Sequence, residues 1–105
     1  MHELRLELLA PAWNELEQIA DRHLFLVGAS SAQKITDKLL DCLDNLKTNP
    51  YLGIECTESI LKSESYRKLI CGNYLCFYKV FSDAVYVYHI ADGRTDYPKL
   101  FEQYK

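Results

Sequence analysis

The sequence contains no apolar run that approaches the roughly 20 residues needed to span a bilayer. Its first residues mix acidic, basic and apolar side chains, so no secretory signal peptide is visible. Repeats, low-complexity tracts and a second domain boundary are also missing. We therefore expect one domain over residues 1–105, which stays in the cytoplasm and has no membrane partner.

A strong excess of positive charge is missing as well. The formal net charge of the chain is −3. Residues 1–61 contain five Lys or Arg against ten Asp or Glu, and residues 62–105 contain seven against five. Proteins that bind nucleic acid directly usually have a strongly basic face. The composition therefore argues against direct nucleic-acid binding and leaves room for only a small positive patch in the C-terminal half.

The four cysteines lack the spacing of a metal site. Cys42, Cys56, Cys71 and Cys76 form no C-x-x-C pair, and the histidines are not paired at metal-binding spacing. We therefore expect neither zinc nor another cofactor. Because thiols are kept reduced in the cytoplasm, we also expect four reduced and partly buried cysteines.

The first half of the chain shows strand-like and then helical periodicity. Leucines alternate with charged residues over residues 2–9, which predicts a half-buried strand. Two amphipathic helices should follow, one between Pro11 and Gly28 and one that begins with a capping box of Ser30 and Gln33. Their predicted apolar faces are Trp13, Leu16, Ala20, Leu24 and Val27 in the first helix, and Ile35, Leu39, Cys42, Leu43 and Leu46 in the second.

The second half is organised around three tyrosine-rich apolar runs, at residues 66–71, 74–80 and 84–90. The two-residue connection Gly72-Asn73 is of the kind that closes a β-hairpin, so the runs should form an antiparallel meander. The middle run is apolar on both of its alternating sides, which predicts a central strand. Residues 51–64 have no clear period and are expected to form a surface loop with at most one short turn.

The predicted fold class is α+β. A strand, a two-helix hairpin and a three-stranded meander should form one sheet with the helices on one face. The second face of that sheet is expected to be partly open and available for binding. Residues 97–105 should form a short C-terminal helix or a docked tail.

Two motifs in the meander resemble those of the RelE/ParE toxin superfamily. The segment from Gly72 to Val80 is similar to a GNY-x-x-FYRV hairpin, and the segment from Asp92 to Pro98 is similar to an HGRRDYP motif. The resemblance, which extends to the element order, implies the toxin of a bacterial type II toxin–antitoxin pair. Such a toxin inhibits growth until a cognate antitoxin binds it, and it contacts operator DNA only through that antitoxin.

The superfamily divides by target. ParE-like members inhibit DNA gyrase, whereas RelE-like members cleave mRNA on the ribosome by attack of a 2′-hydroxyl on the adjacent phosphate. Cleavage calls for a proton acceptor, a cation at the developing charge and a proton donor. Leu69 and Leu75 stand where nuclease members have basic residues, and Asp92 replaces a histidine of the motif. We therefore favour gyrase over the ribosome as the target.

The resemblance also assigns roles to individual residues. If the chain is a ribosome-dependent endoribonuclease, Arg67, Arg94 and Tyr97 are the implied catalytic residues. Lys79, Arg94 and Lys99 are the implied contacts to a substrate or a protein target. A third alternative is an inactive relative that binds only its antitoxin.

These side chains also have structural explanations. Arg67 can pair with a surface carboxylate, and Tyr97 can pack the C-terminal segment onto the sheet. The strand tyrosines can stack on bases but are better explained as half-buried strand formers. His89 lies within a strand and is expected to be packed or hydrogen-bonded.

Overall fold

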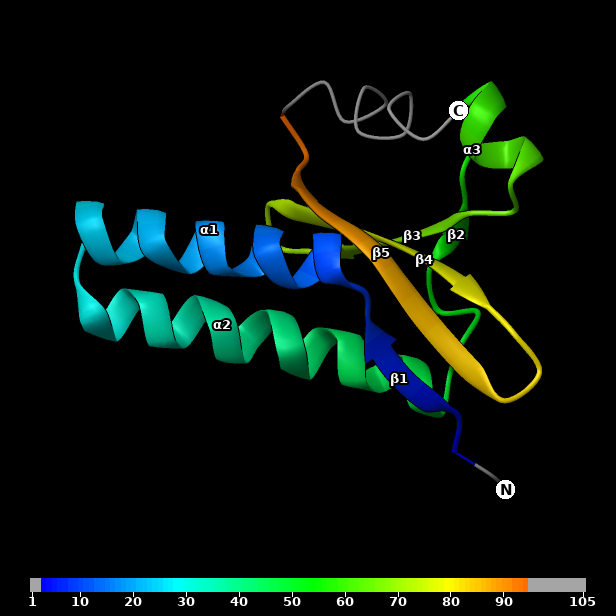
Figure 1. Ribbon diagram of the computed structural model, residues 1–105, viewed down its shortest axis with the longest axis horizontal. Coiled ribbons are helices and arrows are strands. Elements are labelled where there is room, and N and C mark those ends of the chain that lie inside the picture. The colour runs from blue at the N-terminus through cyan, green and yellow to red at the C-terminus, as the bar shows by residue number, and fades with distance from the viewer. Residues whose placement is uncertain (1–2, 95–105) are drawn as a thin grey trace.

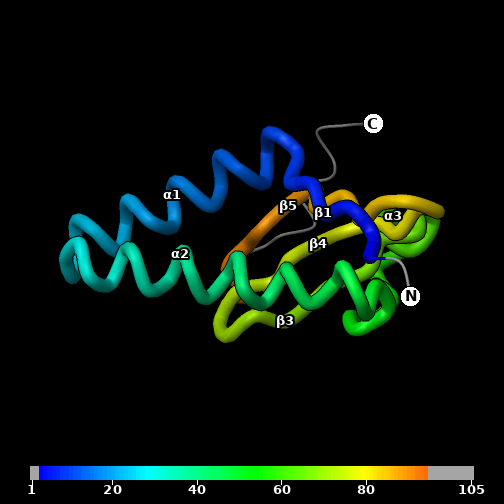
Figure 2. The backbone as a smooth tube through the Cα atoms, turned by 90° about the horizontal axis from the view of Figure 1, so that it is seen from below, coloured from blue at the N-terminus to red at the C-terminus, as the bar shows by residue number. Residues whose placement is uncertain are grey.

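The computed structural model of the protein describes residues 3–94, so the predicted tail at residues 97–105 lies outside the described residues. Its elements are β1 (Arg5–Leu8), α1 (Ala10–Leu26), α2 (Ala29–Asp44), a 3₁₀-helix η1 (Asn45–Lys47), β2 (Ile54–Glu55), α3 (Ser59–Ser63), β3 (Arg67–Cys71), β4 (Tyr74–Val80) and β5 (Ala84–Asp92). Helices α1 and α2 form an antiparallel hairpin on one face of the sheet (Figures 1 and 2). The α+β class is therefore confirmed. Within residues 3–94, no helix is long and apolar enough to cross a membrane.

The five strands form one sheet in the order β1-β5-β4-β3-β2. Strand β1 is parallel to β5, and the other neighbours are antiparallel. The predicted meander and the central position of β4 are confirmed. Strand β2 was not predicted, because a two-residue strand such as Ile54–Glu55 is too short to show an alternating pattern.

Strand β4 is buried on both faces. Its alternate residues Tyr74, Cys76 and Tyr78 belong to the core beneath the helices, whereas Phe77 belongs to a second core on the other face. Cys56 and Leu61 come from the segment between β2 and β3 and complete this second core. The second face was expected to be partly open, and the structure contradicts this where residues 56–66 cover it.

A β-bulge in β5 changes which residues face the helices. Phe77 pairs with His89 and Tyr78 pairs with Val87, so Tyr88 is the extra residue. The helix-facing positions therefore shift from the odd-numbered Val87 to the even-numbered Ile90. Because of the bulge, β5 contributes residues to the core beneath the helices both before and after Tyr88.

The buried face of α1 differs from the predicted stripe. Ala12, Leu16 and Ile19 are buried, whereas Trp13, Leu24 and Val27 of the predicted set are 46%, 52% and 73% exposed. The prediction is confirmed for Leu16 and wrong for these three. Leu24 and Val27 are exposed because the last turns of α1 extend beyond the sheet (Figure 1), and in the first turn Ala12, not Trp13, is buried. The predicted face of α2 is confirmed, since Leu39, Leu43 and Leu46 are buried with Ile35 and Cys42 packed beside them.

The turn between α1 and α2 does not use the predicted capping box. Gly28 is the N-cap of α2, with a φ of 135° that favours glycine, and no side chain caps the helix. Gln33 instead donates to Asp37 one turn further along α2, at 3.0 Å. The capping motif fails because the helix begins one residue before Ser30, which places that residue inside the first turn.

The prediction of four reduced cysteines is wrong for two of them. Cys42 on α2 and Cys71 on β3 form a disulfide, with their Cα atoms 6.2 Å apart. The pair is 29 positions apart in the chain, and only the packing of α2 on β3 brings the sulfurs together. Cys56 and Cys76 are free and buried, and burial raises their pKa values to about 11 and about 12.

The buried Tyr78 hydroxyl fixes the segment that leads into β2. It donates to the Pro50 carbonyl and accepts from the Gly53 N–H, both at 2.9 Å. A Cβ on Gly53 would lie 2.5 Å from the Lys68 carbonyl oxygen and 2.6 Å from the Tyr78 hydroxyl. Only glycine therefore fits between β3 and this hydroxyl.

Tyr78→Phe should lower the free energy of unfolding by about 1–3 kcal/mol, because it leaves the Pro50 carbonyl and the Gly53 N–H without their partner. Urea unfolding followed by circular dichroism measures the change. The matched control is Tyr86→Phe, whose hydroxyl makes one exposed contact to Arg5 at 3.5 Å and should matter by less than about 0.5 kcal/mol. Equal effects of the two substitutions would contradict a structural role for the buried hydroxyl.

Candidate functional site

Three of the five predicted site residues lie in the described part of the chain. These are Arg67 at the start of β3, Lys79 near the end of β4, and Arg94 just after β5. Tyr97 and Lys99 lie outside the described residues. The geometry of the three cations decides which chemistry the site can perform.

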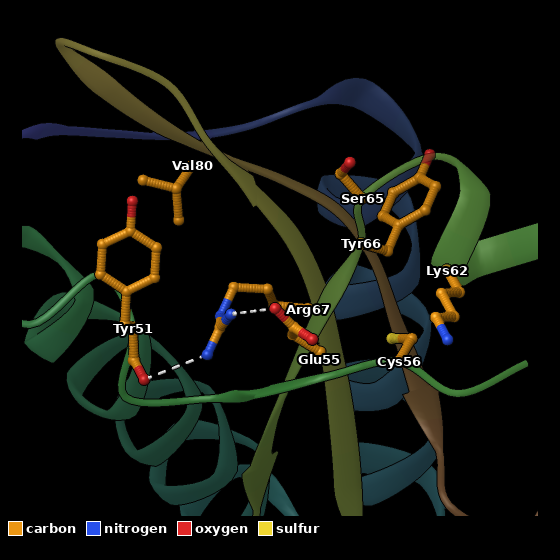
Figure 3. Close-up of a pocket in the computed structure, with 8 residues that line it drawn as sticks. All are labelled: Tyr51, Glu55, Cys56, Lys62, Ser65, Tyr66, Arg67 and Val80. Carbon is orange, nitrogen blue, oxygen red and sulfur yellow. Dashed lines mark hydrogen bonds and ion pairs between the residues drawn. The ribbon is translucent and has the colours of Figure 1, made fainter.

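Arg67 is bound to the chain's own backbone. Its Nη2 donates to the carbonyls of Gly53 at 2.6 Å and Tyr51 at 3.4 Å, and its guanidinium lies 5.1 Å from the centroid of the Tyr51 ring. Glu55 adds an ion pair at 3.7 Å, and only 18% of the arginine side chain is exposed. Figure 3 shows the guanidinium between the Tyr51 carbonyl and the Glu55 carboxylate. Arg67 thus stabilises the segment that carries β2.

A pocket of about 350 Å³ lies beside Arg67 (Figure 3). Its lining is Tyr51, Glu55, Cys56, Lys62, Ser65, Tyr66, Arg67 and Val80. The buried Nε of Arg67 has no hydrogen-bond partner among residues 3–94. The pocket therefore combines the rings of Tyr51 and Tyr66 with the cations Lys62 and Arg67.

Lys79 is held by aromatic rings. Its Nζ lies 4.5 Å from the centroid of the Tyr66 ring and 5.2 Å from that of Tyr88, and the two rings pack edge to face. Glu64 lies 3.8 Å from the same nitrogen. The lysine side chain is 20% exposed. Lys79 therefore fastens the segment before β3 onto the second face of the sheet.

Arg94 is exposed and paired with Asp92. Its Nε and Nη2 donate to the two carboxylate oxygens at 3.1 and 2.9 Å, and its backbone N–H donates at 2.9 Å. The side-chain hydrogen bonds from Arg94, followed by the backbone one, lower the pKa of Asp92 to about 2. The same pairing raises the pKa of Arg94. The arginine is 84% exposed, so its fork is fixed in position and still faces solvent.

Arg94 lies apart from the other two cations, since Arg67 pairs with Tyr78, next to Lys79 on β4. Lys79 pairs with Tyr86, and Asp92 pairs with Tyr74 at the other end of β4. A separation of five residues along a strand corresponds to about 17 Å. Arg94 and Lys79 are therefore at opposite ends of β4.

The leucines at the expected basic positions are part of the two cores. Leu69 is 6% exposed and belongs to the core beneath the helices. Leu75 packs against the second core. Neither position has space for a cation without loss of packing.

Glu15 and His89 form a buried polar pair that joins α1 to β5. The Glu15 carboxylate lies 3.1 Å from His89 Nδ1 and accepts the Ile90 N–H at 3.0 Å. Strand β1 pairs with β5 only as far as Val87. Beyond that point, the Glu15 carboxylate binds the backbone of β5 in place of a strand. The prediction of a packed or hydrogen-bonded His89 is confirmed, and its 5% exposure makes it unsuitable as a base for an external substrate. The sequence feature that could have identified Glu15 as a buried polar residue is its position next to Leu16, on the buried face of α1.

A second polar cluster joins the helices to β4. His23 lies 3.0 Å from the Ser31 hydroxyl and 3.4 Å from the Tyr74 hydroxyl. Tyr74 is buried, and the cluster ties α1, α2 and β4 together. Within residues 3–94, no three His, Cys, Asp or Glu side chains gather as a possible metal site.

An apolar groove lies where α2 meets the outer edge of the sheet. We call it the edge groove; it has a volume of about 330 Å³ and is lined by Cys42, Leu52, Gly53, Ile54, Lys68, Leu69 and Ile70. Ile70 is 62% exposed and Ile54 is 56% exposed. Strand β2 pairs only with Arg67 and Lys68, so among the described residues the outer edge of β3 at Ile70 has no neighbouring strand.

The chain is similar to a known protein family in sequence and to solved structures in fold. Residues 6–97 match the family model described as the ParE toxin of the type II toxin–antitoxin system, parDE. No curated protein matches the chain in sequence.

Two solved structures share the fold. One, described as the chromosomal ParDE TA system from P. aeruginosa, has a TM-score of 0.74 at 18% identity, over 88% of this chain and 98% of that one. The other, the toxin-antitoxin complex RelBE2 from Mycobacterium tuberculosis, has a TM-score of 0.64 at 12% identity, over 88% and 93%.

The Asp92–Arg94 pair generates a test of the site's electrostatics. A carboxyl NMR titration should place the pKa of Asp92 near 2, and Arg94→Ala should move it towards the ordinary 3.8. Because the pKa is depressed in the folded protein, the pair stabilises the fold above about pH 4, and this contribution is lost as the pH falls to about 2. An Asp92 pKa that is unchanged in Arg94→Ala would show that the arginine does not hold the carboxylate.

Proposed function

Because the chain belongs to the ParE toxin family of type II toxin–antitoxin systems, we propose that it inhibits growth by binding DNA gyrase. The observation that carries this proposal is the separation of the cations that cleavage would need. Arg67 and Lys79 are bound within the protein, and Arg94 lies at the opposite end of β4 from Lys79. Inhibition by binding requires no such assembly of groups. Gyrase acts on DNA in the cytoplasm, so the proposal places the toxin there.

The energetics of cleavage also favour a binding mechanism. Removal of one preorganised donor that stabilises a transition state costs about 10²–10³ in rate. Leu69 and Leu75 offer no donor at two expected positions, and Asp92 neutralises Arg94 at a third. A nuclease with these losses would work far below the rate of a complete one.

Arg94 is the proposed anchor for the protein target. Its guanidinium is planar, exposed and held in one orientation by Asp92. Such an arginine loses little side-chain freedom when it binds a carboxylate or an aromatic ring of a partner. Tyr97 and Lys99 follow it in the sequence and are proposed to extend the same surface.

The antitoxin is proposed to bind at the edge groove. An extended segment can pair with the outer edge of β3 and insert apolar side chains between Ile70, Ile54 and α2. Burial of these exposed side chains supplies the affinity. Contact with operator DNA is proposed to occur only through the antitoxin.

A ribosome-dependent endoribonuclease is the second candidate, because the pocket beside Arg67 has features of an RNA site. It combines the rings of Tyr51 and Tyr66 with the cations Lys62 and Arg67. An inactive relative that binds only antitoxin is the third candidate, and it requires that overexpression of the chain alone be harmless.

Arg94→Ala should weaken inhibition of gyrase supercoiling about 10-fold, because it removes an exposed anchor without touching either core. Arg5→Ala is the matched control, since this arginine is also exposed and paired with carboxylates, and it should leave inhibition unchanged. Primer extension on ribosome-bound mRNA, run with the same proteins, tests the alternative. Codon-positioned cuts that are lost in Arg67→Ala or Arg94→Ala, together with normal supercoiling, would reverse the ranking.

Ile70→Lys should weaken binding of the cognate antitoxin about 10- to 100-fold, because a charge would then be buried in the edge groove. Phe81→Lys is the control, as Phe81 is also exposed and lies beyond the other end of β4. Co-purification and calorimetry measure the affinities, and growth assays should show Ile70→Lys toxicity despite the antitoxin. Wild-type affinity in Ile70→Lys would place the antitoxin elsewhere.

A further inference from the structure

Three sulfur atoms lie together beneath the edge groove. Cys42 and Cys71 form the disulfide between α2 and β3, and the Cys76 thiol lies 3.9 Å from the Cys71 sulfur. Cys71 and Cys76 are 3% and 0% exposed. Cys42 is partly exposed and lines the edge groove. Of the two bonded cysteines, Cys42 therefore borders the groove and Cys71 is buried behind it.

We propose that the Cys42–Cys71 disulfide is a reversible redox crosslink and that Cys42 is its modification site for low-molecular-weight thiols such as glutathione. Thiolates attack a disulfide at an accessible sulfur, and of the two bonded cysteines only Cys42 lines the groove whereas Cys71 is buried. In a reducing cytoplasm the crosslink is open, and it closes when the thiol pool becomes oxidised.

The exchange is balanced with glutathione alone. A glutathione thiolate bonds to Cys42 Sγ, the Cys42–Cys71 bond breaks, and Cys71 leaves as a thiolate that takes a proton. A second glutathione thiolate then attacks the glutathione sulfur of the adduct and releases glutathione disulfide and the Cys42 thiolate. Two glutathiones are oxidised and the protein disulfide is reduced to two thiols. The reverse sequence uses glutathione disulfide as the oxidant.

Cys76 does not compete as the attacking group. Burial raises the pKa of its thiol to about 12, so it stays protonated although it lies beside Cys71. Cys56 is on the other face of the sheet, in the second core. The exchange therefore depends on thiols that enter through the edge groove.

The crosslink joins the two walls of the edge groove. When it opens, α2 and β3 are held only by noncovalent packing, such as that of Leu39 and Leu43 in the shared core. The loop it closes spans a sequence separation of 29, long enough for a substantial stabilisation of the folded state. An effect on antitoxin binding rests on the proposed function, whereas the redox chemistry of Cys42 does not.

The thiol count of the full chain tests the crosslink directly. After equilibration with glutathione disulfide, denaturation and alkylation without reductant, mass spectrometry should find two modified cysteines, Cys56 and Cys76. Treatment with dithiothreitol before alkylation should raise the number to four. Four alkylated cysteines in the oxidised sample would overturn the proposal.

The adduct site is tested in mixtures of reduced and oxidised glutathione. The mixed disulfide should map to Cys42 in the wild type, and Cys71→Ser, which leaves Cys42 without its partner, should accumulate one glutathione there. Cys56→Ser, which removes a buried cysteine outside the cluster, should behave as wild type. Adducts that map to Cys71 as often as to Cys42 would contradict attack through the groove.

Thermal unfolding measures the consequence for the fold. Reduction should lower the Tm of the wild type by about 10 °C and leave that of the Cys42→Ser/Cys71→Ser variant unchanged. The same shift in both proteins would show that the reductant acts elsewhere.

Co-purified antitoxin should protect Cys42 from alkylation in the reduced protein. Absence of antitoxin binding in both redox states would refute the proposed function while the thiol counts still decide the crosslink.

Discussion

The burial of β4 on both faces is the constraint on which the rest of the structure depends. A strand with large side chains on both sides needs a cover for each. Helices α1 and α2 cover one face, and residues 56–66 cover the other. The Tyr78 hydroxyl ties the connection between these two covers to the strand itself. Because both faces of β4 are covered, the sheet edge at Ile70 and the end of β5 at Arg94 are among the surfaces that stay open to partners.

The cations Arg67, Lys79 and Arg94 differ in how closely the fold binds them. Arg67 and Lys79 occupy places where a charged group can serve a substrate, yet their partners are backbone carbonyls, aromatic rings and carboxylates of the same chain. Arg67 holds the segment that carries β2, and Lys79 holds the end of the second cover at Glu64 and Tyr66. Arg94 has only a local partner and stays exposed. Among these three, the fold thus separates two cations that stabilise it from one that stays exposed to solvent.

The sequence predicted those features that depend on local alternation and missed those that depend on packing. The alternation from Tyr74 to Val80 was enough to place β4 at the centre and to divide its residues between two cores. The stripe of α1 was right at Leu16 and wrong at Leu24 and Val27, because periodicity does not reveal where a helix leaves its sheet. The disulfide was missed because 29 positions separate its cysteines. Arg67 was identified by motif, but its role in holding Gly53 follows only from the conformation of residues 50–55.

The parallel pairing of β1 with β5 imposes an order on folding during synthesis. Leu6 pairs with Val85, so the first strand must wait for residues that are translated almost eighty positions later. At typical rates of about 5–20 residues per second, this delay is roughly 4–15 s. The helical hairpin and the β3–β4 hairpin rely on nearer neighbours and can form earlier. Each newly made chain therefore passes through a period in which β1 lacks its partner strand, and closure of the sheet is a late step.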